Sequence, residues 1–104
     1  MYKVIGILKR PDGVTVEAFH KWWLEEHALR VKRWPGLKKY TINLAVTGDQ
    51  RYDGVAEVWF ETKEDMQRVF STEQGQTARE SATRHAGELV ILFTEEHPIV
   101  QGAF

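Results

Sequence analysis

The central stretch of the chain, residues 37–61, reads LKKYTINLAVTGDQRYDGVAEVWFE and indicates how the sheet is built. Residues 37–47 and 55–61 are rich in β-branched, aromatic and aliphatic residues, which is typical of strands. The polar segment between them, residues 48–54, has the Gly and Asp residues of a turn. We therefore expect two neighbouring strands that pair antiparallel.

The N-terminal part is expected to contain a strand and then a helix. Residues 2–9, YKVIGILK, carry apolar side chains on both alternating sets, which predicts a strand covered on both faces. After a turn, Thr15 is a suitable N-cap. A helix is expected from there to about Trp34, ended by Pro35–Gly36.

The C-terminal part is expected to repeat the helix and the strand. Thr62 is a suitable cap for a helix whose apolar residues recur at helical spacing: Met66, Val69 and Phe70. After a break near residues 71–75, a further helix is expected to reach about Ala86. Residues 88–95, ELVILFTE, predict the last strand, and a polar tail follows.

The resulting order, βαββαβ, is that of the ferredoxin-like split motif. It predicts an α+β fold with a four-stranded antiparallel sheet and both helical segments on one face. With 104 residues the chain is expected to form one domain over residues 1–104.

The second face of this sheet has no covering element of its own. Because all the predicted strands carry large apolar residues on both sets, that face must also leave water. A second copy of the chain is the simplest cover, so we expect a homodimer. Two sheets packed face to face would form a dimeric α+β barrel, whose interior could hold a small ligand.

Composition argues against several other classes of function. The 14 basic and 15 acidic residues give a net charge of −1, so the chain is not expected to bind nucleic acid or an anionic membrane surface. The absence of cysteine excludes disulfides and thiol catalysis and suits a reducing cytoplasm. No run approaches the roughly 20 apolar residues of a membrane span, and the N-terminus does not read as a signal peptide. We expect a cytoplasmic protein.

The segment HKWWLEEH, residues 20–27, raises the question of a functional histidine. At about 100° per residue, His27 falls on the same helical stripe as Phe19 and Trp23, while Trp22 lies about 60° off it. His27 is therefore either a histidine of the core or a residue that lines a pocket and takes part in its chemistry. Phe19 and Trp23 are core residues by default.

The histidines do not suggest a metal site. His20 and His27 are seven residues apart, about 10 Å along the helix axis, which is too far to share one ion. His97 beside Glu95 and Glu96 is more readily explained as part of a solvated tail. We expect no metal and no organic cofactor.

The strands and the last helix hold further candidates. Glu57 lies on the same set as Trp59, and a carboxylate in so apolar a strand needs either an ion pair or a wet cavity. Tyr40 and Asn43 lie on opposite sets of their strand, so only one of them can face a given cavity unless a bulge intervenes. His85 lies near a helix C-terminus, where a cation is favoured, and is a weaker candidate for ligand contact.

Four blocks of the sequence resemble the EthD family of dimeric α+β barrel proteins. They are Phe19-x-x-Trp22-Trp23-x-x-x-His27, Pro35-Gly36-Leu37-x-x-Tyr40, Tyr52-Asp53-Gly54-x-x-Glu57-x-Trp59-Phe60 and Thr94-Glu95-Glu96-His97. The second and third blocks are also similar to 4-methylmuconolactone methylisomerases, which act without metal or organic cofactor. The resemblance implies a pocket in the barrel interior with His27 on its wall and Tyr40 and Glu57 near it.

The resemblance leaves several functions open. The first is a cofactor-independent enzyme (isomerase, cyclase, dehydratase or oxygenase type) for a small apolar, oxygenated or aromatic-derived metabolite. His27 would be its acid or base, and Glu57 or Tyr40 its partner. Other contacts with the ligand would come from Phe19, Trp23, Trp59, Asn43 and His85. The second is a binding module that shields a hydrophobic intermediate for an oxidoreductase, and the third is a purely structural dimer.

Overall fold

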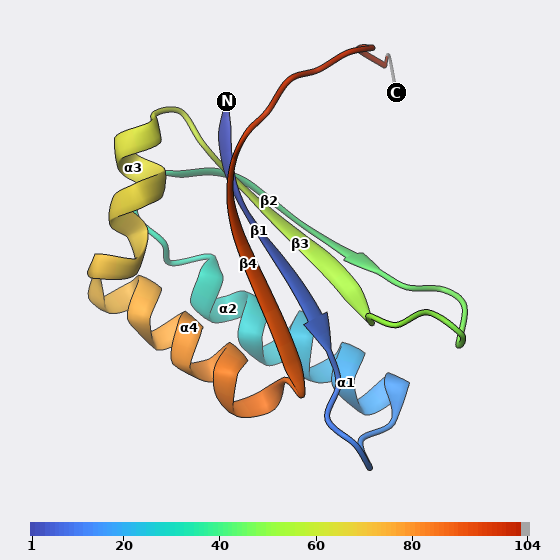
Figure 1. Ribbon diagram of the computed structural model, residues 1–104. Helices are drawn as coiled ribbons and strands as arrows, with labels where there is room; N and C mark the ends of the chain where they lie inside the picture. Colours follow the sequence, from blue (N-terminus) through green and yellow to red (C-terminus); the bar gives the residue numbers. More distant parts are fainter. Residues whose placement is uncertain (103–104) are drawn as a thin grey trace.

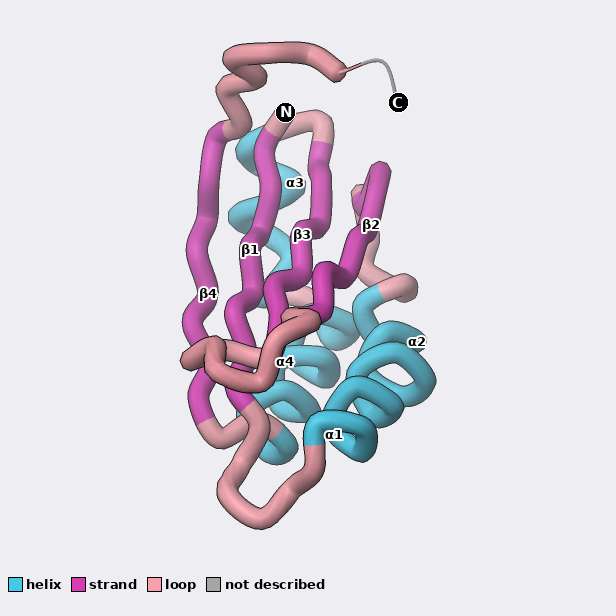
Figure 2. Tube along the Cα trace, turned by 90° about the vertical axis from the view of Figure 1, so that its right-hand side faces the viewer, coloured by secondary structure: helices cyan, strands magenta, loops and turns pink. Residues whose placement is uncertain are grey.

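The computed structural model describes residues 1–102; residues 103–104, the end of the predicted domain and tail, lie outside the described residues. Its strands are β1 (Tyr2–Lys9), β2 (Leu37–Leu44), β3 (Gly54–Phe60) and β4 (Glu88–Glu95). They form one antiparallel sheet in the order β2-β3-β1-β4. The helices lie on one face of it (Figures 1 and 2). The predicted α+β, ferredoxin-like fold is confirmed.

The first helical segment changes its winding in the middle. It consists of α1 (Val16–Trp22), the π-helical turn η1 (Trp23–His27) and α2 (Ala28–Val31). As expected, the Thr15 hydroxyl caps the first turn and accepts a hydrogen bond from Ala18 N–H at 3.1 Å. The segment ends before Pro35, as the sequence predicts.

The second helical segment comprises α3 (Lys63–Arg68), the 3-10 turn η2 (Val69–Ser71) and α4 (Glu73–His85). The Thr72 hydroxyl accepts a hydrogen bond from Gly75 N–H at 3.0 Å, so α4 begins at the break itself. A Cβ at position 75 would collide with the Val69 carbonyl oxygen, which explains why glycine stands there.

The register of the strands assigns each side chain to one face of the sheet. Val4 of β1 lies opposite Val58 of β3, which in turn lies opposite Tyr40 of β2, and all three face the helices. The alternate set, which includes Lys3 and Trp59, faces away from them. We call these two surfaces the helix face and the open face. Within residues 1–102, the two clusters of buried core residues pack against the helix face.

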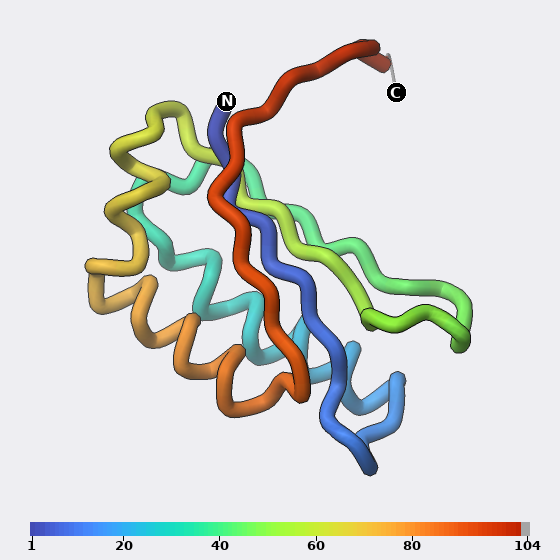
Figure 3. Tube along the Cα trace, in the orientation of Figure 1, coloured from blue at the N-terminus to red at the C-terminus, as the bar shows by residue number. Residues whose placement is uncertain are grey.

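The N-terminus and the segment that follows β4 lie at the same end of the sheet (Figure 3). Figure 3 shows the segment after β4 passing beside the N-terminus and turning away from the helices. Its start is held by the Glu96 N–H, which donates a hydrogen bond to the Met1 carbonyl at 2.8 Å. Among the described residues, no helix has the length and apolar character needed to cross a membrane.

Candidate functional site

A cavity of about 50 Å³ lies between the helix face of the sheet and the helices. Its origin is the small size of facing side chains. Gly6 and Ala56 lie opposite each other on β1 and β3, and Ala78 and Ala82 of α4 also line the space. Most of the remaining wall is aliphatic or aromatic. The polar side chains that reach it are those of His27, Tyr40 and Arg79, together with the indoles of Trp23 and Trp34.

The π-helical turn positions His27. The Ala28 N–H donates to the carbonyl of Trp23, five residues back, so this turn contains one more residue than an α-helical turn. As a result Trp22 and Trp23 are both buried, and the ring of His27 stacks on that of Trp22 with 5.0 Å between centroids. Trp22 belongs to the regular α1 helix and does not line the cavity, which agrees with its predicted place off the inner stripe. It is nevertheless buried, since His85 of α4 stacks on it.

His27 is a neutral imidazole at neutral pH. Its Nδ1 atom lies 3.2 Å from the hydroxyl oxygen of Ser81 on α4, and both side chains are buried. Burial, reinforced by the positive charges of Arg30 and His85, lowers the pKa of His27 to about 4. The Ser81 hydroxyl can either donate to Nδ1 or accept the Nδ1 proton, so this contact is compatible with both tautomers of the neutral imidazole.

Tyr40 presents a hydroxyl that lacks a hydrogen-bond partner within the described chain. Burial raises the pKa of Tyr40 well above its usual range, so the phenol stays protonated. The indole N–H of Trp23 lies near enough to oppose this rise, but the two groups do not have the geometry of a hydrogen bond.

Three buried polar atoms around the cavity lack a partner within residues 1–102: Trp23 Nε1, Trp34 Nε1 and the Tyr40 hydroxyl. An unsatisfied buried donor costs on the order of 1–3 kcal/mol, so such groups are rare in native proteins. All three belong to residues that line the same small cavity.

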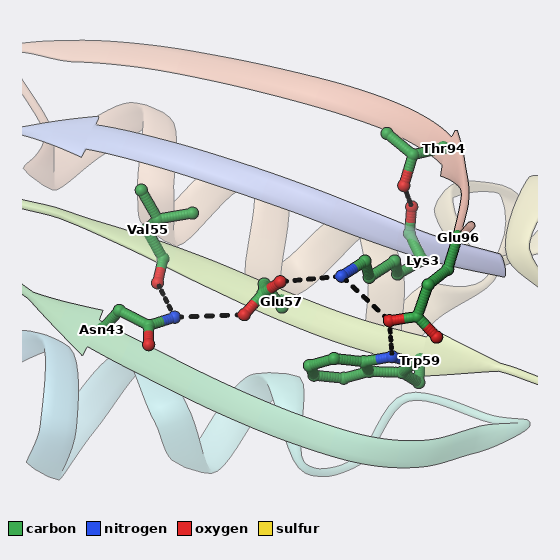
Figure 4. Close-up of polar contacts among 7 residues, drawn as sticks. All are labelled: Lys3, Asn43, Val55, Glu57, Trp59, Thr94 and Glu96. Carbon is green, nitrogen blue, oxygen red and sulfur yellow. Dashed lines mark hydrogen bonds and ion pairs between the residues drawn. The ribbon is translucent and has the colours of Figure 1, made fainter. Parts of the chain in front are cut away.

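Glu57, Asn43 and Trp59 lie on the open face and are separated from His27 by the sheet. Figure 4 shows their network: Glu57 accepts from Lys3 Nζ at 2.8 Å and from Asn43 Nδ2 at 3.2 Å, and Trp59 Nε1 donates to Glu96 at 3.1 Å. Of the two alternatives for Glu57, the structure shows the ion pair with a neighbouring strand. Glu57 and His27 do not converge on one ligand position. The expectation that His27 lines the interior of a barrel formed by two open faces is wrong, because the helix that carries His27 packs on the helix face and His27 lines the cavity there.

The network on the open face is balanced in charge. Lys3 also contacts Glu96 at 3.2 Å, and the Lys3 and Lys39 ammonium groups lie 4.7 and 4.6 Å from the centre of the Trp59 ring. Burial alone would lower the pKa of Lys3, but the hydrogen bonds that its ammonium group donates to Glu57 and Glu96 outweigh burial and raise the pKa. The polar groups of this network, those of Lys3, Asn43, Glu57, Trp59 and Glu96, therefore all have a partner.

Phe19 and His85 lie beside the cavity without lining it. Phe19 is buried and stacks on Trp22. The imidazole of His85 covers Trp22 from the solvent side, with ring centroids 4.9 Å apart, and its Nδ1 lies 2.9 Å from the Ser81 carbonyl. Both residues therefore support Trp22, on which His27 stacks, and they reach a cavity ligand only through it.

The sequence analysis did not name four residues that contact the cavity or His27 as site residues: Ser81, Trp34, Phe70 and Arg79. It did expect Phe70 among the apolar residues of its helix. Ser81 could have been found from its place between Ala78 and Ala82, the small residues that form the inner side of α4. No local pattern distinguishes Arg79 from the other exposed arginines, because only the packing of α4 on the sheet brings it to the cavity.

The structure offers no group of three or more His, Asp or Glu side chains within residues 1–102 that could hold a metal ion. His97 pairs with Glu95 at 2.7 Å in an exposed position. Glu96, the third member of that triplet, is turned toward Lys3 and Trp59.

The fold and the site define a ferredoxin-like α+β protein with a helix-covered internal cavity. The family model described as "EthD domain" matches residues 11–84. The chain belongs to the EthD family.

Comparison with solved structures agrees with the fold. An EthD family protein from Bacillus halodurans is 23% identical, with a TM-score of 0.83 over 93% of this chain and 99% of that one. HapK from Hahella chejuensis is 16% identical, with a TM-score of 0.73 over the full length of both chains. A dimeric protein with a ferredoxin-like fold from Bacteroides fragilis is 14% identical, with a TM-score of 0.70 over 91% of this chain and 95% of that one. No curated protein sequence matches the chain.

Proposed function

We propose that the cavity binds a small, largely apolar, oxygenated metabolite and that His27 and Tyr40 act on it by acid–base chemistry without a cofactor. One observation carries this proposal. Three unpartnered polar groups and a neutral imidazole surround one apolar space. Apolar walls with a few convergent polar groups are the usual construction of small-molecule sites.

The two side chains have complementary roles in such a reaction. With Ser81 accepting from Nδ1–H, the Nε2 lone pair of His27 is free to take a proton from the ligand. The protonated Tyr40 hydroxyl and the indole N–H groups can donate hydrogen bonds to an oxygen on which negative charge develops. The proton returns from His27 to another atom of the ligand, which amounts to isomerisation or elimination.

The size of the cavity restricts the ligand. A cavity of roughly 150 Å³ accepts a benzene ring, and this cavity is about 50 Å³. A ligand with a ring therefore has to displace part of the wall. Phe70 is the best candidate to move, since it is only half-buried and lies on the short η2 turn.

A second candidate function is a binding module that shields a reactive apolar intermediate without changing it. The low pKa of His27 favours this alternative, because an imidazole that is protonated only near pH 4 is a weak base at neutral pH. Both functions need the cavity, and they differ in whether proton transfer depends on His27.

Cyclopentanone, a small apolar ketone, tests both candidates. Binding is followed through the fluorescence of the cavity indoles, and exchange of its α-protons in D₂O is followed by NMR. We expect His27→Ala to slow exchange by about 10²-fold and Tyr40→Phe by about tenfold while binding is largely kept. His97→Ala, in the exposed tail, is the control. Binding without exchange that depends on His27 would exclude the enzyme and favour the shielding module. Absence of binding would exclude both candidate functions.

We propose in addition that the protein is a homodimer joined through the open faces of two sheets. The open face carries a band of aliphatic side chains next to the Lys3–Glu57 network: Ile5, Ile7, Val55, Val90 and Leu92. Leu92 is 46% exposed in the single chain. A face of this kind is typical of surfaces buried between subunits.

A further inference from the structure

Arg79 reaches the wall of the cavity with its charge unpaired. Within the described chain, its guanidinium is absent from the ion pairs, and no acidic residue stands three or four positions from it on α4. Its guanidinium carbon lies over the face of Phe70, 5.5 Å from the ring centre. A cation stacked on an aromatic ring leaves its edge N–H donors free.

Arg79 and Phe70 also line a second space, a surface hollow of about 470 Å³ over η2 and α4. Its other lining residues are Gln76, Glu80, Thr83 and Arg84. Because Phe70 and Arg79 belong to both walls, they form the partition between the inner cavity and this hollow. Phe70 meets Trp34 edge-on at 5.3 Å, so displacing Phe70 would open the hollow toward an unpartnered cavity indole.

Resting on the function proposed above, we propose that the ligand carries a carboxylate and that Arg79 binds it at the mouth of the cavity. The apolar part of the ligand then lies among the unpartnered groups inside, and the carboxylate remains in the hollow. Arg79 offers a planar pair of donors that matches a carboxylate, with Gln76 and Thr83 available as further donors and Arg84 adding positive charge. Glu80 lies on the same wall, and its negative charge would repel a bound anion.

The test compares carboxylic acids with their neutral amides: isobutyrate with isobutyramide, benzoate with benzamide, and 3-phenylpropanoate with 3-phenylpropanamide. Their dissociation constants are measured at pH 7.5 by indole fluorescence and by calorimetry. We expect at least one acid to bind about tenfold or more tightly than its amide, since a hydrogen bond to a charged group is worth more than a neutral one.

Arg79→Gln should remove the preference for the acid and leave amide binding unchanged, and Arg79→Lys should keep only part of it. Arg68→Gln on α3, an exposed arginine that lines neither space, is the matched control and should behave as the natural chain does. Melting temperatures of all variants show whether a loss of binding reflects unfolding.

The outcomes separate this inference from the proposed function. Equal binding of an acid and its amide, or an acid preference that survives Arg79→Gln, overturns the role of Arg79 while the cavity remains a binding site. If neither member of any pair binds, the cavity function itself fails, and the carboxylate assignment fails with it.

Discussion

The two faces of the sheet treat polar groups in opposite ways. On the helix face, Trp23, Trp34 and Tyr40 bury donors without a partner around a cavity. On the open face, Lys3, Glu57 and their neighbours satisfy one another within the chain. Because an unpaired buried group destabilises the fold, its presence requires a reason other than folding, and the ligand binding proposed above would provide one. A satisfied network needs no ligand and can serve at a subunit contact.

The largest expected difference between the faces comes from a matched pair of tryptophans. Trp23→Ala removes a fully buried core side chain and should cost on the order of 3–5 kcal/mol of unfolding free energy. Trp59→Ala removes a ring covered by two lysines and should cost about 1–2 kcal/mol. Urea unfolding at one low protein concentration measures both. Equal losses would mean that the open face is as much a core as the helix face.

Acid should destabilise the helix face through His27. The unfolded chain protonates this imidazole near the ordinary pKa of 6.5 and the native protein only near 4, so the unfolded state binds more protons in between. The contribution of His27 to the free energy of unfolding is fully present above about pH 6.5. It should fall by on the order of 3 kcal/mol as the pH drops to 4. Urea unfolding between pH 4 and 8 measures this loss.

The matched control for the acid effect is His27→Gln. This variant should be less stable at neutral pH but should lose the part of the pH dependence that belongs to His27. His20→Gln, which alters a histidine whose Nε2 lies 3.4 Å from a backbone carbonyl, should retain it. An unchanged pH profile in His27→Gln would show that the imidazole is not held neutral by burial.

The open face is tested by a charge placed in its aliphatic band. Leu92→Lys should weaken the proposed homodimer by at least about tenfold, because a lysine in the centre of an apolar contact must be desolvated. Leu29→Lys on α2, where leucine is 53% exposed, should leave association unchanged. Sedimentation equilibrium at micromolar concentration distinguishes them, and a stable monomer of the natural chain would exclude this dimer.

The smallest effect concerns the ion pair of the open face. A double-mutant cycle with Lys3→Met and Glu57→Gln should give a coupling of about 1 kcal/mol, since their side chains are only 15% and 25% exposed. The same cycle on Lys38 and Glu61, at 3.9 Å and largely exposed, should give nearly zero. Similar coupling energies in the two pairs would show that partial burial does not strengthen the ion pair of the open face.

Local sequence signals predicted the elements of the fold closely. The caps at Thr15 and Thr62 and the stop at Pro35–Gly36 act within a few residues of themselves, so they can be read without knowing the tertiary structure. The alternation in residues 55–61 likewise placed Glu57 and Trp59 on one side of β3 and Val58 on the other. The placement of His27 on the inner side of its helix also follows from periodicity.

The π-helical turn escaped the sequence analysis because nothing in WLEEH departs from α-helical composition. The extra residue is accommodated by packing of Trp22 and Trp23 against Phe19 and His85, which come from other turns and from α4. Uniform winding therefore could not foresee the stacking of Trp22 on His27.

By itself, the sequence determined the order of the elements, their ends and the inward position of His27, because each depends on interactions between residues close along the chain. Only the tertiary structure decided which side chains share a site. The packing of the helices on the sheet decided that Glu57 points away from the helices while Tyr40 points toward them. The packing of α4 brought Ser81 and Arg79 close to His27 and its cavity. Such contacts join residues up to 54 positions apart, and no local pattern encodes them.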